Sequence, residues 1–143
     1  MTTFATGPRP PPGKEEECIA AARAAIGVRF RVHGRSPDFG LDCVGLAALA
    51  ARAAGFAGEI PGNYALRGGD AATLVARFDA SGLVRCPSVP GAIALFETGP
   101  AQFHLAVLVP GGIVHADAML RRVVERPGDA PWPTLGCWCV RGE

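Results

Sequence analysis

The sequence lacks a surplus of charge, a long apolar run and any C-x-x-C pair. Its 143 residues include 14 basic and 13 acidic ones, which leaves a formal net charge of +1. A balance this even gives no electrostatic reason to expect a nucleic acid or a membrane surface as a partner. The most apolar stretch, 44–54, is too short to cross a bilayer and contains Arg52. These absences argue against nucleic-acid-binding proteins and against insertion into a membrane.

The first 13 residues contain no apolar core of a secretory signal, so we expect synthesis in the cytoplasm. Action elsewhere would then need a carrier. The five cysteines are an odd number, and a disulfide framework is not expected in a chain of this size. Four of the five are therefore interpreted as reduced, mostly buried thiols. A zinc site built from Cys137, Cys139 and a histidine is an open alternative.

The composition is that of a globular chain, with 49% hydrophobic and 19% charged residues. Residues 1–13 are rich in proline and glycine and predict a flexible lead-in. Residues 14–143 are long enough for a single domain with one buried core. No internal repeat is found.

Helix signals come first along the chain and strand signals follow. Asp42 and Asp70 are good N-caps, and Gly27 and Gly55 are good helix stops. Helices are predicted over 14–26, 43–54 and 70–80. Short strands are predicted over 92–96, 103–109, 113–116, 121–125 and 135–141. This order is typical of an α+β domain, with helices packed on an antiparallel sheet of about five strands.

Cys43 comes directly after the cap Asp42, in the first turn of a helix that is apolar nearly all round. The free N–H groups and positive partial charge of a helix N-terminus favour thiolate over thiol. They predict a lowered pKa for Cys43 and could also hold an oxyanion. The competing interpretation is a small core residue in an alanine-rich helix.

The chain offers three histidines as a base for such a nucleophile. His33 lies in an arginine-rich loop, His104 opens an apolar strand, and His115 ends the next strand. His104 and His115 are eleven residues apart around a Pro-Gly-Gly turn. Two paired antiparallel strands would bring them into neighbouring rows of one sheet, as a base and a residue that orients it.

Four segments together resemble the NlpC/P60 cell-wall peptidases. The DCVGL run resembles the family's D-C-S-G-L, GAIALF its G-D-L-V-F, HLAV its H-V-G-I, and GIVHA its G-x-M-I-H-A; these are residues 42–46, 91–96, 104–107 and 112–116. Their order and spacing fit from about residue 23 to residue 125. Residues 30–35 and 40–43 are similar to the branch found in phage tails and in gene transfer agents of α-proteobacteria.

The resemblance implies a papain-like fold and hydrolysis of a peptide bond in peptidoglycan, typically next to D-glutamate or diaminopimelate. Carried over, Cys43 is the nucleophile, His104 the base and His115 the polar orienter. No cofactor and no metal are implied. The implied partners are the peptidoglycan stem peptide and hub or baseplate proteins of a tail. The implied location is a tail particle that acts on the periplasmic cell wall.

The sequence departs from the family at two positions near the nucleophile. Val44 replaces the usual serine and Phe30 a frequent tyrosine, so both stand with Asp42 and His33 as candidates for contact with substrate or oxyanion. Asp42 could bind a substrate amine, although N-capping alone explains it. Trp132 is predicted to lie in the core or at a partner interface. Two alternatives are a structural tail component with little activity and a papain-like amidase or acyltransferase.

Overall fold

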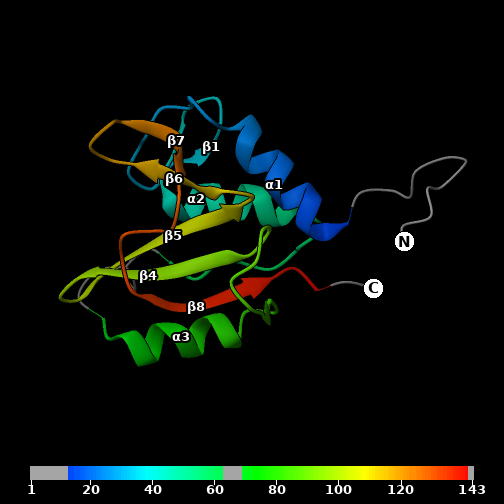
Figure 1. Cartoon of the computed structure of the whole chain (residues 1–143), viewed down its shortest axis with the longest axis vertical. Helices are drawn as coiled ribbons and strands as arrows, with labels where there is room; N and C mark the ends of the chain where they lie inside the picture. Colours follow the sequence, from blue (N-terminus) through cyan, green and yellow to red (C-terminus); the bar gives the residue numbers. More distant parts are fainter. Residues whose placement is uncertain (1–12, 63–68, 142–143) are drawn as a thin grey trace, which may run out of the picture.

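The computed structural model describes residues 13–62 and 69–141, which form three helices and eight strands (Figure 1). The helices are α1 (Lys14–Ala24), α2 (Cys43–Ala53) and α3 (Ala71–Asp79). The strands are β1 (Arg35–Ser36), β2 (Gly40–Leu41), β3 (Val84–Arg85), β4 (Ile93–Gly99), β5 (Gln102–Val109), β6 (Gly112–Asp117), β7 (Arg122–Pro127) and β8 (Thr134–Cys139). Residues 1–12 of the predicted flexible lead-in lie outside the described residues.

The main sheet has six strands in the order β3-β8-β4-β5-β6-β7, and neighbouring strands are antiparallel. The predicted α+β class is confirmed, with helices first and strands after. The predicted number of about five strands misses β3, because a strand of two residues shows no alternation of apolar and polar side chains. Residues 28–41, between the first two predicted helices, contain the two-residue strands β1 and β2, which the sequence pattern does not predict.

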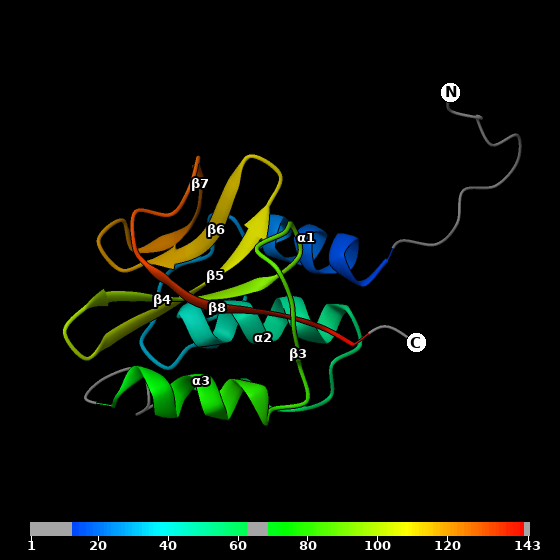
Figure 2. The same cartoon turned by 60° about the horizontal axis from the view of Figure 1, so that its bottom comes forward.

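One face of the sheet carries the helices. Leu95 of β4 and Leu105 of β5 share a buried cluster there with Ala47 of α2 and Phe78 of α3. Figure 2 shows α2 and α3 on the same side of β4 and β8. The alanines of α2 let its backbone approach the strands closely, since a methyl group takes little space. This packing fixes the start of α2 beside the start of β5.

Side chains of the opposite face alternate with these along the same strands. Phe96 of β4 and Ala106 of β5 belong to a second cluster, into which no helix of the described residues packs. Trp132, from the segment between β7 and β8, packs against this cluster instead. His104 and His115 alternate with the helix-facing residues in the same way, so their side chains leave the sheet on this second face. The irregular segment that contains Trp132 covers that face.

Both predicted helix caps are confirmed. The Asp42 carboxylate accepts a hydrogen bond from the Gly45 N–H at 2.8 Å, and the Asp70 carboxylate accepts one from the Thr73 N–H at 2.7 Å. Gly55 follows α2 with a φ of 96°, a left-handed conformation that favours glycine. Local sequence thus sets where α2 begins and ends.

A disulfide joins Cys86 to Cys139, with 6.1 Å between the Cα atoms. The prediction of reduced thiols was wrong for this pair. Pairing of β3 with β8 places the residue after Arg85 beside the end of β8, although the two cysteines are 53 residues apart in sequence. Cys18, Cys43 and Cys137 are free and buried.

Within the described ranges, 13–62 and 69–141, no helix has both the length and the apolar character that a membrane span needs.

Candidate active site

A pocket of about 1140 Å³ contains all seven residues that the sequence marks as a candidate site. We call one side the helix wall, made of Phe30, His33, Asp42, Cys43 and Val44. We call the other side the histidine wall, made of His104, His115, Asp117 and Trp132. The fold thus brings the start of α2 and two strands of the sheet to one cavity.

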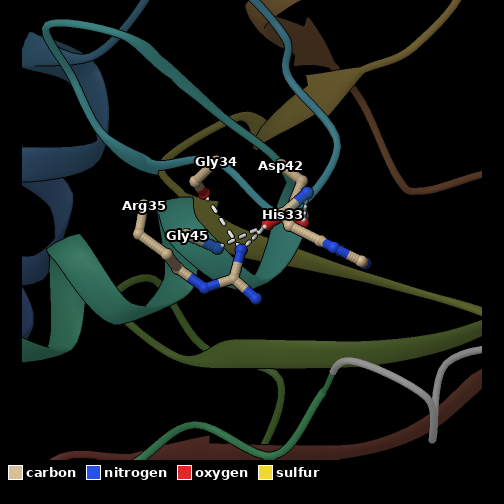
Figure 3. Close-up of polar contacts among 5 residues, drawn as sticks. All are labelled: His33, Gly34, Arg35, Asp42 and Gly45. Carbon is tan, nitrogen blue, oxygen red and sulfur yellow. Dashed lines mark hydrogen bonds and ion pairs between the residues drawn. The ribbon is translucent and has the colours of Figure 1, made fainter.

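The helix wall is organised around the Asp42 carboxylate (Figure 3). Asp42 Oδ1 accepts hydrogen bonds from the Gly45 N–H at 2.8 Å and from Arg35 Nη1 at 2.7 Å. Asp42 Oδ2 accepts one from the His33 N–H at 2.9 Å. The guanidinium of Arg35 also donates to the Gly34 carbonyl at 3.0 Å. These contacts tie the loop before α2 to the first turn of the helix.

Gly45 makes this arrangement possible. A Cβ at position 45 would collide with the Gly34 carbonyl oxygen, so only glycine lets the loop approach the helix this closely. Figure 3 shows the His33 imidazole directed away from the Asp42 carboxylate. The contacts of Asp42 within the protein account for its presence, whereas substrate contact by Asp42 or His33 stays a prediction.

Cys43 lies at the start of α2 with 9% of its surface exposed. Burial raises the pKa of its thiol to about 11, because it disfavours the charged thiolate. Hydrogen bonding from the backbone of Leu105 opposes this rise, the Asp42 carboxylate adds to it, and Arg35 lowers the pKa again. The predicted lowering was therefore wrong: burial outweighs the helix N-terminus. At neutral pH the thiol carries its proton and needs a base.

His104 and His115 form a hydrogen-bonded pair, with 2.9 Å between His104 Nε2 and His115 Nδ1. Their rings meet nearly at right angles, at 83°. The antiparallel pairing of β5 with β6, with Val107 opposite Val114, produces this meeting. The expectation that the turn brings both imidazoles together is confirmed, while their catalytic roles stay predictions.

Both imidazoles are neutral at pH 7. Burial lowers the pKa of His104 to about 4, and the charge of His115 lowers it further, while Asp117 opposes the shift. Burial also lowers the pKa of His115; there Asp117 acts in the opposite direction and Arg126 adds to the lowering. A neutral imidazole has a lone pair, so His104 can accept a proton.

The sulfur of Cys43 lies beside β5, since the pKa of its thiol responds to a hydrogen bond with the backbone of Leu105, the residue next to His104. Among the residues that the structure describes, no hydrogen bond links the thiol to either imidazole. Catalytic hydrogen bonds are often long before substrate binds and tighten in the complex. The two walls therefore place a thiol and a pair of imidazoles on two sides of one cavity.

Sequence reasoning missed two residues of the histidine wall. Trp132 lies edge-on to both imidazoles, with ring centroids 5.3 Å from His104 and 5.8 Å from His115. It thus lines the pocket, in addition to the core or interface role expected of it. Asp117 Oδ2 lies 4.0 Å from His115 Nε2. The period of two along a strand could have pointed to Asp117, because residues 115 and 117 share a face.

Val44 and Phe30 bring apolar surface to the helix wall. Val44 is buried, and its side chain occupies the space that a Cβ at Gly62 would need. Phe30 also packs against the core under α1 and α2. No group of three or more His, Cys, Asp or Glu side chains in the described ranges is placed to hold a metal ion.

No protein-family model matches the sequence, and no curated relative matches it. Solved structures do match it. NlpC1 from Trichomonas vaginalis superposes with a TM-score of 0.64 at 18% identity, over 88% of this chain and 43% of that one. NlpC2 from the same organism gives 0.62 at 18% identity, over 89% and 47%. The NlpC/p60 domain of the peptidoglycan hydrolase SagA gives 0.52 at 19% identity, over 79% and 88%.

The chain has an NlpC/P60-type fold. This confirms the predicted papain-like α+β architecture, with the cysteine at the start of a buried helix and the histidines on the sheet. The chain spans less than half the length of the two Trichomonas proteins. At such low identity the likeness concerns the fold, and the chemistry depends on the residues of the two walls.

Proposed function

We propose that this chain is a cysteine peptidase that hydrolyses a peptide bond in the stem peptide of peptidoglycan. The observation that carries the proposal is the hydrogen-bonded pair of His104 and His115, 2.9 Å apart, in the same pocket as Cys43. The similar domain of SagA, a peptidoglycan hydrolase, supports the substrate class. Peptide bonds next to D-glutamate or diaminopimelate are the expected targets.

The reaction begins with the protonated thiol of Cys43. As its sulfur attacks the carbonyl carbon of the peptide bond, neutral His104 takes the thiol proton. The free N–H groups at the start of α2 stabilise the oxyanion of the tetrahedral intermediate. His104 then gives the proton to the leaving amine, and a thioester remains on Cys43. Water hydrolyses the thioester with His104 again as base, which restores the thiol.

The proposal also includes a carrier: a phage tail or a related particle delivers the enzyme to the cell wall. Its support is the similarity of residues 30–35 and 40–43 to the tail-associated branch. The Cys86–Cys139 disulfide suits action outside the reducing cytoplasm, because such bonds persist in oxidising surroundings. Hub or baseplate proteins of the tail are the proposed partners, and the periplasmic cell wall is the proposed place of action.

The test is digestion of purified sacculi by wild type and by Cys43→Ala. We expect wild type to release muropeptide fragments and Cys43→Ala to release none, while both give the same circular dichroism spectrum. Cys18→Ala, which removes a buried thiol of α1, is the matched control and keeps the activity of wild type. Equal release by wild type and Cys43→Ala, or no release by wild type, would falsify the proposal. Hydrolysis of acylated amines in place of muropeptides would identify an amidase.

A structural tail component of low activity is the second candidate, favoured by the burial of Cys43 and by a pKa of about 11. A chloromethyl ketone built on a muropeptide tests it, since such a probe places its reactive carbon at the thiol. A peptidase labels Cys43 with this probe much faster than with iodoacetamide. Equally slow labelling by both reagents favours the structural component.

A further inference from the structure

Four polar groups follow one another along the pocket. The Cys43 thiol lies beside β5, and His104 is the third residue of that strand. His115 Nδ1 lies 2.9 Å from His104 Nε2, and Asp117 Oδ2 lies 4.0 Å from His115 Nε2. The last group stands two residues after His115 on β6.

The carboxylate of Asp117 is held in one orientation. Its Oδ1 accepts hydrogen bonds from the N–H groups of Met119 and Leu120, at 2.8 and 3.0 Å, in the turn that leads to β7. Its Oδ2 is left to face His115. The turn thus aims one carboxylate oxygen at the imidazole.

A hydrogen bond between two neutral imidazoles has one donor and one acceptor, so two arrangements are possible. In the first, His104 Nε2–H donates to His115 Nδ1. His104 Nδ1 then keeps its lone pair, and the proton of His115 is on Nε2, facing Asp117. In the second, His115 Nδ1–H donates to His104 Nε2. The proton of His104 is then on Nδ1, and a lone pair of His115 Nε2 faces the carboxylate.

We propose that Asp117 is a positioning residue which selects the first arrangement, so that His104 presents an unprotonated Nδ1 to the thiol of Cys43. The carboxylate attracts the Nε2–H of His115 and repels an Nε2 lone pair. When the proton of His115 is on Nε2, its Nδ1 can only accept a hydrogen bond, so His104 Nε2 must carry the proton that it donates. The position of the proton on His115 thereby sets the position of the proton on His104. This inference rests on the proposed function, because it assigns the direction of proton transfer in that reaction.

The negative charge of Asp117 near the two imidazoles also supports its role as a positioning residue. Asp117 counteracts the lowering of the pKa of both imidazoles, whereas burial, and for His115 also Arg126, lower it. A positive charge that forms on His104 during the attack is therefore stabilised by Asp117 through His115. Loss of the carboxylate weakens the base and moves the acid limb of the activity profile to lower pH.

Asp117→Asn separates positioning from a purely structural role. Asparagine keeps an oxygen for the N–H groups of Met119 and Leu120, so the turn survives. Its amide NH₂ then faces His115 Nε2 as a donor, which favours the second arrangement. We expect kcat/KM to fall by roughly 10- to 100-fold, the loss that follows when the carboxylate that orients a metal-bound histidine is replaced. Asp38→Asn, in an exposed loop, removes the same charge elsewhere and leaves kcat/KM unchanged.

The direct readout is the protonation site of each ring, measured from ¹⁵N chemical shifts of histidine-labelled protein and assigned with His33→Gln and His104→Gln. We expect the proton of His104 on Nε2 in wild type and on Nδ1 in Asp117→Asn. A wild-type His104 protonated on Nδ1 overturns the inference, and so does a pattern that Asp117→Asn leaves unchanged. Wild type alone decides if the variant fails to fold. The measurement needs no turnover, so it stands even where the sacculus assay refutes the proposed function.

Discussion

The two walls of the pocket differ in how their hydrogen bonds are made. In the helix wall, the Asp42 carboxylate accepts hydrogen bonds from two backbone N–H groups and from the guanidinium of Arg35, which can only donate. In the histidine wall, two neutral imidazoles share a proton whose position can change. The helix wall is thus a fixed support for the thiol, whereas the histidine wall holds groups that can accept a proton and return it.

Replacing His104 should give the largest effect on activity, because it removes the proposed base from the histidine wall. We expect His104→Gln to lower kcat/KM on muropeptides by roughly 10²- to 10⁴-fold, the usual contribution of general base catalysis. Glutamine fills a similar volume and keeps a polar end beside His115. A loss of less than threefold would show that another group takes the thiol proton.

Removing the disulfide tests whether the geometry of both walls depends on the β3 edge of the sheet. The Cys86–Cys139 bond closes a long loop, so the double variant Cys86→Ser, Cys139→Ser should lose roughly 2–4 kcal/mol of unfolding free energy. Its kcat/KM at a temperature where it is fully folded should match wild type. Urea unfolding with and without reductant measures the first effect. Reductant should destabilise wild type and leave the double variant unchanged; the opposite pattern would contradict a disulfide in the folded protein.

Acid should act on the histidine wall in particular. The pKa of His104 is about 4 in the folded protein, against an ordinary value of 6.5 in the unfolded chain. The stability that its neutral form contributes is therefore complete above about pH 6.5 and is lost as pH falls toward 4. We expect wild type to lose on the order of 1–2 kcal/mol from this source between pH 7 and pH 5. Urea unfolding of His104→Gln should show a weaker pH dependence, and equal slopes would count against a buried neutral imidazole.

Removing the cap of α2 should act on the helix wall and give the smallest change. Asp42→Ala deletes the acceptor for the Gly45 N–H, which costs about 1 kcal/mol for a typical N-cap. Asp70→Ala, which removes the corresponding cap of the exposed start of α3, is the matched control. Thermal melts should show a larger fall in Tm for Asp42→Ala, since Arg35 and His33 lose a partner as well. Equal falls would mean that the network adds nothing to capping.

The parts of the site that were predictable depend on short stretches of sequence. Asp42 before an apolar helix is a local signal, and the turn between His104 and His115 fixes their meeting through the hairpin. These features need no knowledge of the rest of the chain. The helices and five of the six strands of the main sheet follow from similar local patterns.

The parts that escaped prediction depend on distant contacts. The pKa of Cys43 follows from burial under the sheet, which the helix N-terminus alone does not reveal. The pairing of Cys86 with Cys139 needs the two residues of β3 to find β8 across most of the second half of the chain. Trp132 reaches the imidazoles through an irregular segment flanked by prolines, whose path no periodicity describes.

The burial of Cys43 also affects how readily its sulfur is oxidised. Peroxide attacks thiolates far faster than thiols, so a sulfur with a pKa of about 11 is a slow target for oxidation to sulfenic and sulfinic acid. Cys86 and Cys139 are already in an oxidised, stable form. A chain built this way can stay in an aerobic medium with the Cys43 thiol intact. Under the proposed function, the sulfur reacts only when a substrate is bound and His104 takes the thiol proton.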